Sequence, residues 1–157
     1  MCIRDSSEGD EGDGSYLAHR LGLDSCTQQN VLVSNYSGKQ LAQASVPVAS
    51  AASLVAMKLH SVGERRSSRP DKRSGDIFDI VRLVLAEGAQ TIASDLRHAG
   101  CPALCASAAR LAELYFNTEA QRSLRWLRAD SRAPQMSEID LDDLADVSQL
   151  STLLLTE

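Results

Sequence analysis

Residues 54–84, LVAMKLHSVGERRSSRPDKRSGDIFDIVRLV, decide the fold expected for this chain. Apolar residues recur in this stretch at the spacing of an amphipathic helix, first within 50–65 and again within 75–87. The connection between the two segments is short, so we expect the helices to pack as an antiparallel pair. Five cations occupy that connection: Arg65, Arg66, Arg69, Lys72 and Arg73.

Lys58 lies on the apolar flank of the first helix. On a helical wheel it falls about 60° from the centre of the stripe formed by Val55, Leu59 and Val62. Its stem can pack while its ammonium reaches the edge of a cleft, where a lysine serves as a point charge for phosphate. The alternative is an ordinary flank residue of an amphipathic helix.

The second helix places two carboxylates on neighbouring faces. Its apolar side chains cover roughly 220° of the circumference, and Asp76 lies inside that arc, where a carboxylate requires a cation, a metal or hydrogen-bond donors. Alternatively, Asp76 is a first-turn residue favoured by the helix dipole. Asp79 lies at the edge of the arc and either joins the same site or pairs with Arg82 at i,i+3.

A lysine, a cationic loop and inward carboxylates are what a nucleoside triphosphate site requires. The chain has a formal net charge of -5, so a local basic excess suggests a specific anion rather than general coating of nucleic acid, although a solvated loop is the alternative. The candidate catalytic residues are Lys58, Asp76 and Asp79. The candidate phosphate or RNA contacts are Arg65, Arg66, Lys72 and Arg73.

These motifs resemble a known family. The succession VPVASAASLVAMKLH (46–60), ERR (64–66) and DKRSGDIFDIVRL (71–83) is similar to the second half of the nucleotidyltransferase-fold toxins of the AbiEii/AbiGii type. Lys58 matches the lysine of their K-[LI]-x-[AS] motif, and Asp76 and Asp79 match their D-[LI]-x-D-[LI] motif. RSLRWLR (122–128) and DLDDLADVSQL (140–150) also look like their helical C-terminal half.

The resemblance implies transfer of NMP from a nucleoside triphosphate to RNA, with tRNA as the expected acceptor, in a bacterial toxin–antitoxin or phage-defence system. Lys58 would hold the triphosphate, and the two aspartates would orient it or assist deprotonation of the attacking hydroxyl. Mg²⁺ and NTP are expected in the full-length parent, and neither is expected on this fragment, which has no predicted metal ligands. A cognate antitoxin is a further expected partner.

The family also has an upstream G-G-[ST]-x-L turn and an [ST]-x-D-[ILV]-[DE] strand, and neither is found before Lys58. Residues 1–6, MCIRDS, resemble the translated mosaic end of a transposase adapter used for sequencing libraries. We therefore expect an N-terminally truncated fragment. Its predicted parts are a polar, disordered start at 1–14, a β-hairpin remnant of the nucleotidyltransferase sheet at 15–49, and a helical domain at 50–157.

The predicted fold class is α+β, mostly α: a hairpin followed by a helical bundle. Alternating residues at 30–34 and 43–48 flank a turn at 35–39. Helices are expected at 50–65, 75–87, 89–99, 102–116, 118–128 and, broken or frayed, 137–154. Thr118 with Gln121 has the pattern of a capping box, and Trp126 is expected to anchor the core, with base stacking as the alternative.

The amino-acid composition limits the classes of protein to which the chain could belong. With 43% hydrophobic residues the chain can bury a core, and with 4% aromatics that core must be filled by Leu, Val and Ala. The sequence has no apolar run of the ~20 residues that cross a bilayer and no signal-peptide pattern, so we expect a cytoplasmic protein without membrane contact. The four cysteines lack zinc-site spacing.

A different class of function stays open beside the enzyme. The chain could be a noncatalytic helical binding module, with its acidic C-terminal segment docking a basic partner such as an antitoxin. Upstream sequence discriminates the two classes, because a Gly-Ser turn and an Asp-x-Asp strand before Ser7 would favour the enzyme. A native stop codon just before Met1 would favour the module.

Overall fold

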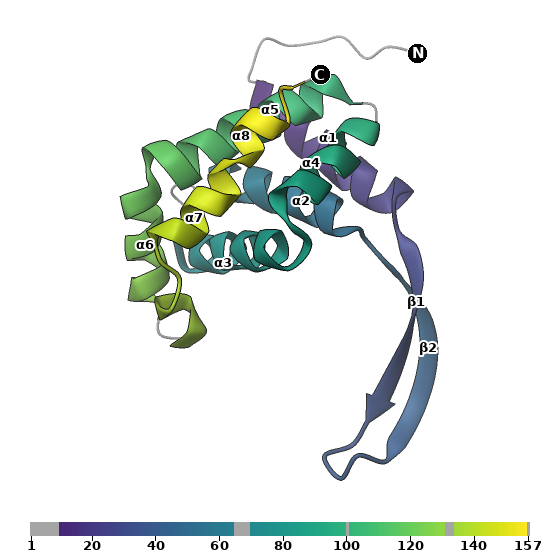
Figure 1. Cartoon of the computed structure of the whole chain (residues 1–157). Helices are drawn as coiled ribbons and strands as arrows, with labels where there is room; N and C mark the ends of the chain where they lie inside the picture. The colour runs from purple at the N-terminus through teal and green to yellow at the C-terminus, as the bar shows by residue number, and fades with distance from the viewer. Residues whose placement is uncertain (1–9, 65–69, 100, 131–133, 157) are drawn as a thin grey trace.

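The computed structural model describes residues 10–64, 70–99, 101–130 and 134–156. It confirms the predicted class: a body of packed helices carries one antiparallel hairpin, which projects from the body as a curved arm (Figure 1). No helix among the described residues combines the length and apolar character needed to cross a membrane. That the hairpin derives from a nucleotidyltransferase sheet stays a prediction.

The chain begins with helix α1 (Asp10–Asp24), which sequence analysis did not predict. Residues 10–14 were expected to be disordered, and this was wrong, because they form the first turns of the helix; residues 1–9 lie outside the described residues. Gly14 is buried, and a Cβ there would lie 2.3 Å from Cε1 of His60. The glycine therefore permits close packing of α1 on the body, whereas glycine content had been taken as a sign of disorder.

The arm consists of β1 (Thr27–Ser34) and β2 (Gln40–Val48), paired from Thr27 with Val48 to Ser34 with Gln40. Its tip is the predicted turn. The Asn35 side chain accepts hydrogen bonds from the backbone N–H groups of Ser37 and Lys39, at 3.1 and 2.9 Å, and Gly38 has a φ of 79°. At the base, the hydroxyl of Ser25 lies 3.2 Å from that of Ser53, which ties the start of the arm to the helix that follows it.

Two helices form the predicted antiparallel pair. These are α2 (Ala51–Glu64) and α3 (Pro70–Glu87), and they pack along their apolar faces. Helix α3 begins at Pro70 rather than at Gly75, because proline suits the first turn of a helix and glycine is tolerated within it. The extra turn places Asp76 inside the helix.

The remaining helices cover α2 and α3. They are α4 (Ala89–His98), α5 (Pro102–Ala112), the π-helical turn η1 (Glu113–Thr118), α6 (Ala120–Ala129), the 3-10 turn η2 (Pro134–Ser137), α7 (Leu141–Ser148) and α8 (Leu150–Leu153). The expected capping box at Thr118 was wrong, since α6 is preceded by Glu119 without a side-chain cap. A capping box occurs instead at Asp140 and Asp143, before α7.

The core is aliphatic, as the low aromatic content predicted. Its largest fully buried side chains come from eight helical elements, with Phe116 as the one aromatic among them. Trp126 packs at the margin of this core against Tyr115, with ring centroids 6.5 Å apart, which agrees with the predicted packing role. The arm contributes no residue to the core.

The burial of side chains along α3 predicts how much each face of the helix contributes to the free energy of unfolding. Ile80 is fully buried whereas Leu85 is 46% exposed. We expect Ile80→Ala to lower the free energy of unfolding by about 2–5 kcal/mol, because it leaves a cavity in the core. Leu85→Ala on the same helix should change it by less than about 0.5 kcal/mol. Urea unfolding followed by circular dichroism measures both values, and equal losses would contradict the packing described here.

Candidate functional site

The α2–α3 pair brings the three predicted catalytic side chains together. The Lys58 ammonium donates a hydrogen bond to Asp76 Oδ1 at 2.9 Å and another to Asp79 Oδ2 at 2.7 Å. Convergence of Lys58 and Asp76 across the two helices was predicted and is confirmed. The three residues form one cluster, the Lys58 cluster, with one cation and two carboxylates.

The three side chains differ in their access to solvent. Asp76 is 5% exposed, Lys58 is 32% exposed and Asp79 is 46% exposed. Asp76 therefore lies beneath the ammonium, in the seam between the helices, and Asp79 lies at the surface. A molecule arriving from solvent would meet Asp79 and Lys58 before Asp76.

Both alternatives for the carboxylates are answered by this geometry. Asp76 is not a first-turn residue, because α3 begins at Pro70. Asp79 pairs with Lys58, and among the described residues no ion pair joins Asp79 to Arg82. The Arg82 guanidinium lies instead over the ring of Phe78, 5.6 Å from its centroid.

Lys58 is a stable cation in this position. Burial opposes its charge and is the largest single influence on its pKa, but the hydrogen bonds and charges of Asp79 and Asp76 together outweigh it. The pKa of Lys58 is consequently raised above its ordinary value of 10.5. At neutral pH Lys58 can attract or hold an anion, and it cannot serve as a general base.

A pocket of about 430 Å³ opens beside the Lys58 cluster. Lys58, Asp79 and Arg82 supply its polar groups, and its apolar wall comes from Leu54, Leu83 and Ala86. The two cations can contact an anionic group and the apolar wall a flat or apolar part of the same molecule, while the Asp79 carboxylate offsets part of the positive charge of the pocket. Arg82 belongs to this site although sequence analysis considered it only as a partner for Asp79; its i,i+3 spacing from Asp79 was the available signal.

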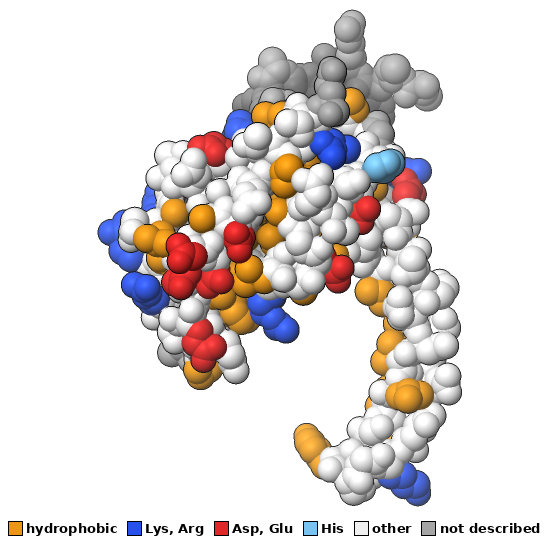
Figure 2. All heavy atoms as spheres, in the orientation of Figure 1, with side chains coloured by type: hydrophobic (Ala, Val, Ile, Leu, Met, Phe, Trp, Pro, Cys, Tyr) orange, Lys and Arg blue, Asp and Glu red, His pale blue; other side chains and the backbone are white. Residues whose placement is uncertain are grey.

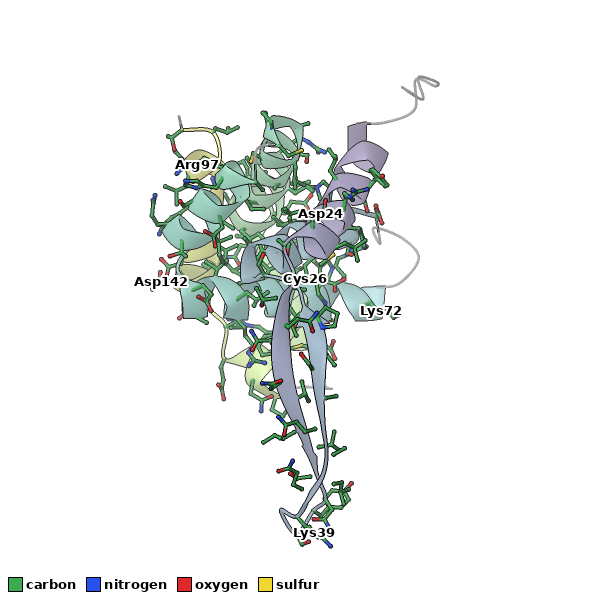
Figure 3. All side chains as sticks on the ribbon, turned by 90° about the vertical axis from the view of Figure 1, so that its right-hand side faces the viewer. Asp24, Cys26, Lys39, Lys72, Arg97 and Asp142 are labelled. Carbon is green, nitrogen blue, oxygen red and sulfur yellow. The ribbon has the colours of Figure 1, made fainter. Side chains whose placement is uncertain are left out.

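Of the four predicted phosphate or RNA contacts, the structure describes Lys72 and Arg73, and neither of them lines the pocket beside the cluster. Arg65 and Arg66, together with Arg69, lie outside the described residues. Lys72 is exposed near the start of α3, at the edge of the helical body (Figure 3). These cations were predicted to lie in one basic loop, but Lys72 is part of helix α3.

Arg73 has a different position from the one predicted. It is 4% exposed, and its guanidinium lies 4.5 Å from the centroid of the Trp126 ring, between α3 and α6. Next to it, the Ser74 hydroxyl donates a hydrogen bond to Asp130. This burial argues against contact with phosphate or RNA, because stacking on an aromatic ring already uses the planar cation as a packing group.

The cluster does not by itself fit a Mg²⁺ ion. The described residues contain no group of three or more His, Cys, Asp or Glu side chains arranged for a metal. The oxygens of Asp76 and Asp79 that face the seam are hydrogen-bonded to the ammonium of Lys58, whose positive charge repels a second cation.

Comparisons with protein-family models, curated proteins and solved structures found no match to this chain. The resemblance to the AbiEii/AbiGii toxins accordingly rests on the sequence motifs alone.

The raised pKa of Lys58 predicts how stability changes at alkaline pH. The stabilising effect of the charge should be fully present below the pKa of Lys58 in the unfolded chain and should be lost as pH rises through the higher folded value. In Lys58→Met this dependence should be absent. Urea unfolding of both proteins from neutral pH to above pH 10.5 measures the difference. A difference that stays constant over that range would contradict the assignment.

Proposed function

We propose that this chain is the C-terminal part of a nucleotidyltransferase-like toxin of a bacterial toxin–antitoxin or phage-defence system. In the full-length parent, the enzyme would transfer NMP from an NTP to RNA, with tRNA as the acceptor. The observation that supports this best is the placement of Lys58 between two carboxylates at the mouth of a pocket. The three residues of the Lys58 cluster are also the residues that match the motifs of the AbiEii/AbiGii toxins.

The exposure of each side chain suggests its role. Asp76 is the buried partner, so it positions the ammonium from below. Asp79 is the exposed partner, so it can exchange Lys58 for a substrate group. When a phosphate oxygen takes the place of Asp79 on the ammonium, the Asp79 carboxylate becomes available to accept a proton from an attacking hydroxyl. Lys58 then offsets negative charge that develops on the phosphate.

The charge of the cluster explains why other elements are required. One lysine and two aspartates give a net negative charge, which disfavours a triphosphate. In this proposal the parent supplies Mg²⁺ sites and a phosphate-binding turn upstream of the chain, and the NTP brings the metal that neutralises its own charge. The chain alone should therefore have no transferase activity.

A noncatalytic binding module is the alternative function. The observation in its favour is a group of acidic side chains on the body beside α7 (Figure 2), where Asp142 and Asp146 are exposed. Such a surface suits a basic partner, which would be an antitoxin in the proposed system. Part of this acidity has a structural explanation, since Asp140 and Asp143 cap α7.

Transfer of radioactive label from an NTP to RNA by the full-length parent tests the proposal. We expect Lys58→Ala to lower transfer by roughly 100-fold or more, because it removes the cation at the phosphate. Asp79→Asn should have a similar effect on kcat with folding retained. Lys39→Ala is the matched control: Lys39 lies at the tip of the arm (Figure 3) and should leave the rate unchanged.

The two functions predict different results for the same variants. Wild-type transfer by folded Lys58→Ala and Asp79→Asn parents would show that the cluster is a structural ion pair. Label transfer by the isolated chain would show that this chain does not depend on Mg²⁺ sites and a phosphate-binding turn supplied by the rest of the parent, as the proposal requires. Loss of binding to a basic partner in Asp142→Asn, with transfer absent in every protein, would favour the module.

A further inference from the structure

The pocket beside the Lys58 cluster has an ordered sequence of polar and apolar side chains. Asp79 and Arg82 are at i,i+3 spacing on α3, so they are neighbours on one side of the helix. Leu54 precedes Lys58 at i,i+4 spacing on α2 and lines the same pocket as Arg82. From the cluster outward, the pocket therefore presents a cation, a carboxylate, a second cation and then an apolar wall.

Arg82 is held in place without being neutralised. Its spacing from Asp79 would allow an ion pair, but Asp79 pairs with Lys58 at 2.7 Å. The Arg82 guanidinium lies over the ring of Phe78, 5.6 Å from its centroid. A ring attracts the cation through its quadrupole and accepts none of the hydrogen bonds that a carboxylate would accept. The N–H donors of Arg82 therefore stay available to a ligand in the pocket.

The charges in the pocket favour an anion in the place of Asp79. Lys58 and Arg82 each carry one positive charge, and Asp79 is the carboxylate among the residues that line the pocket. The Asp79 side chain is 46% exposed, so water screens its attraction to Lys58. A ligand that displaces Asp79 from the ammonium meets two cations at once.

A phosphate monoester fits these two cations better than a carboxylate does. It carries a charge of about -1.5 to -2 near pH 7 and has three acceptor oxygens. A carboxylate has a single charge and two oxygens. One phosphate oxygen can accept a hydrogen bond from Lys58 while the others accept from the planar fork of Arg82. The phosphate can therefore bridge α2 and α3.

The apolar wall indicates what is attached to the phosphate. Leu54 and Leu83 are half-buried and Ala86 is exposed, and none of these side chains has a hydrogen-bonding group. They can pack against a sugar or a flat base. The volume of about 430 Å³ lies within the range of small-molecule sites, roughly 300–1,000 Å³. A phosphate joined to a base through a sugar, which is a nucleotide, matches both parts of the pocket.

We propose that Arg82 is a second phosphate-binding residue, which together with Lys58 bridges the phosphate of a nucleotide. The identification of the ligand as a nucleotide rests on the proposed function. Arg82 supplies the charge that allows the phosphate to displace Asp79, because Lys58 alone is held by two carboxylates. The base packs on the wall of Leu54, Leu83 and Ala86, which lacks the donors and acceptors needed to distinguish one base from another.

Binding of AMP to this chain, followed by NMR titration, tests the role of Arg82. Arg82→Gln is compared with Arg125→Gln, the matched control, because Arg125 is exposed on α6 and does not line the pocket. Both variants remove one positive charge. We expect AMP binding to weaken by roughly tenfold or more in Arg82→Gln and to stay at the wild-type level in Arg125→Gln. Equal losses in the two variants would overturn the proposal, since they would reflect net charge alone.

Removal of the competing carboxylate supplies a second readout. Asp79→Asn should tighten AMP binding, because the phosphate then displaces an uncharged amide, and it should not tighten binding of adenosine, which lacks the phosphate. Adding Arg82→Gln should cancel the gain. The proposal is wrong if neither the wild-type chain nor Asp79→Asn binds AMP, or if the gain persists without Arg82.

Kinetics of the full-length parent separate a failure of this inference from a failure of the proposed function. Arg82→Gln should raise the KM for NTP and leave the KM for RNA unchanged. Label transfer by Arg82→Gln at the wild-type KM for NTP would overturn the role of Arg82 and leave the transferase standing. Arg82-dependent binding of AMP, with no transfer by the wild-type parent, would overturn the transferase and leave the phosphate site standing.

Discussion

The carboxylate of Asp76 is the constraint on which the arrangement of the helices depends. It lies in the apolar seam between α2 and α3 and is 5% exposed, and a buried charge is tolerated only when a cation or donors accompany it. Lys58 supplies that cation from the facing helix. The need for the two groups to meet fixes the rotation of α2 against α3, and the same rotation buries Leu59 and Ile80 in the core.

The same pairing accounts for a site that is both stable and reactive. Asp76 holds Lys58 from the buried side, and Asp79 covers it on the solvent side, where the pocket with Arg82 begins. Asp79 is the weaker partner, because a pair of which one member is half exposed is screened by water. A phosphate can therefore compete with Asp79 without breaking the contact that holds the helices together. The proposed function depends on this difference between the buried Asp76, which holds Lys58 in place, and the exposed Asp79, which a phosphate can displace from Lys58.

Much of this organisation could be predicted from sequence because it depends on local periodicity. The helical wheel placed Lys58 and Asp76 on covered faces, and the Asn-Tyr-Ser-Gly turn marked the arm. The errors have physical reasons. The helix was predicted to start at Gly75, but it begins at Pro70, since proline suits the first turn and a glycine is tolerated within a helix. Helix α1 was not predicted, because Gly14, which permits close packing, was taken as a sign of disorder. The position of Arg73 depends on Trp126, which is distant in sequence, so no local pattern could reveal it.

The most direct test of the central claim is a double-mutant cycle between Lys58 and Asp76, measured as free energies of unfolding at neutral pH. Lys58→Met, Asp76→Asn and the double variant provide the three comparisons with wild type. If the ion pair holds the α2–α3 seam, the sum of the losses in unfolding free energy of the two single variants should exceed the loss of the double variant. The difference, which is the coupling energy, should be about 1–3 kcal/mol. Losses that add to within about 0.5 kcal/mol would contradict the claim, because the two side chains would then act independently.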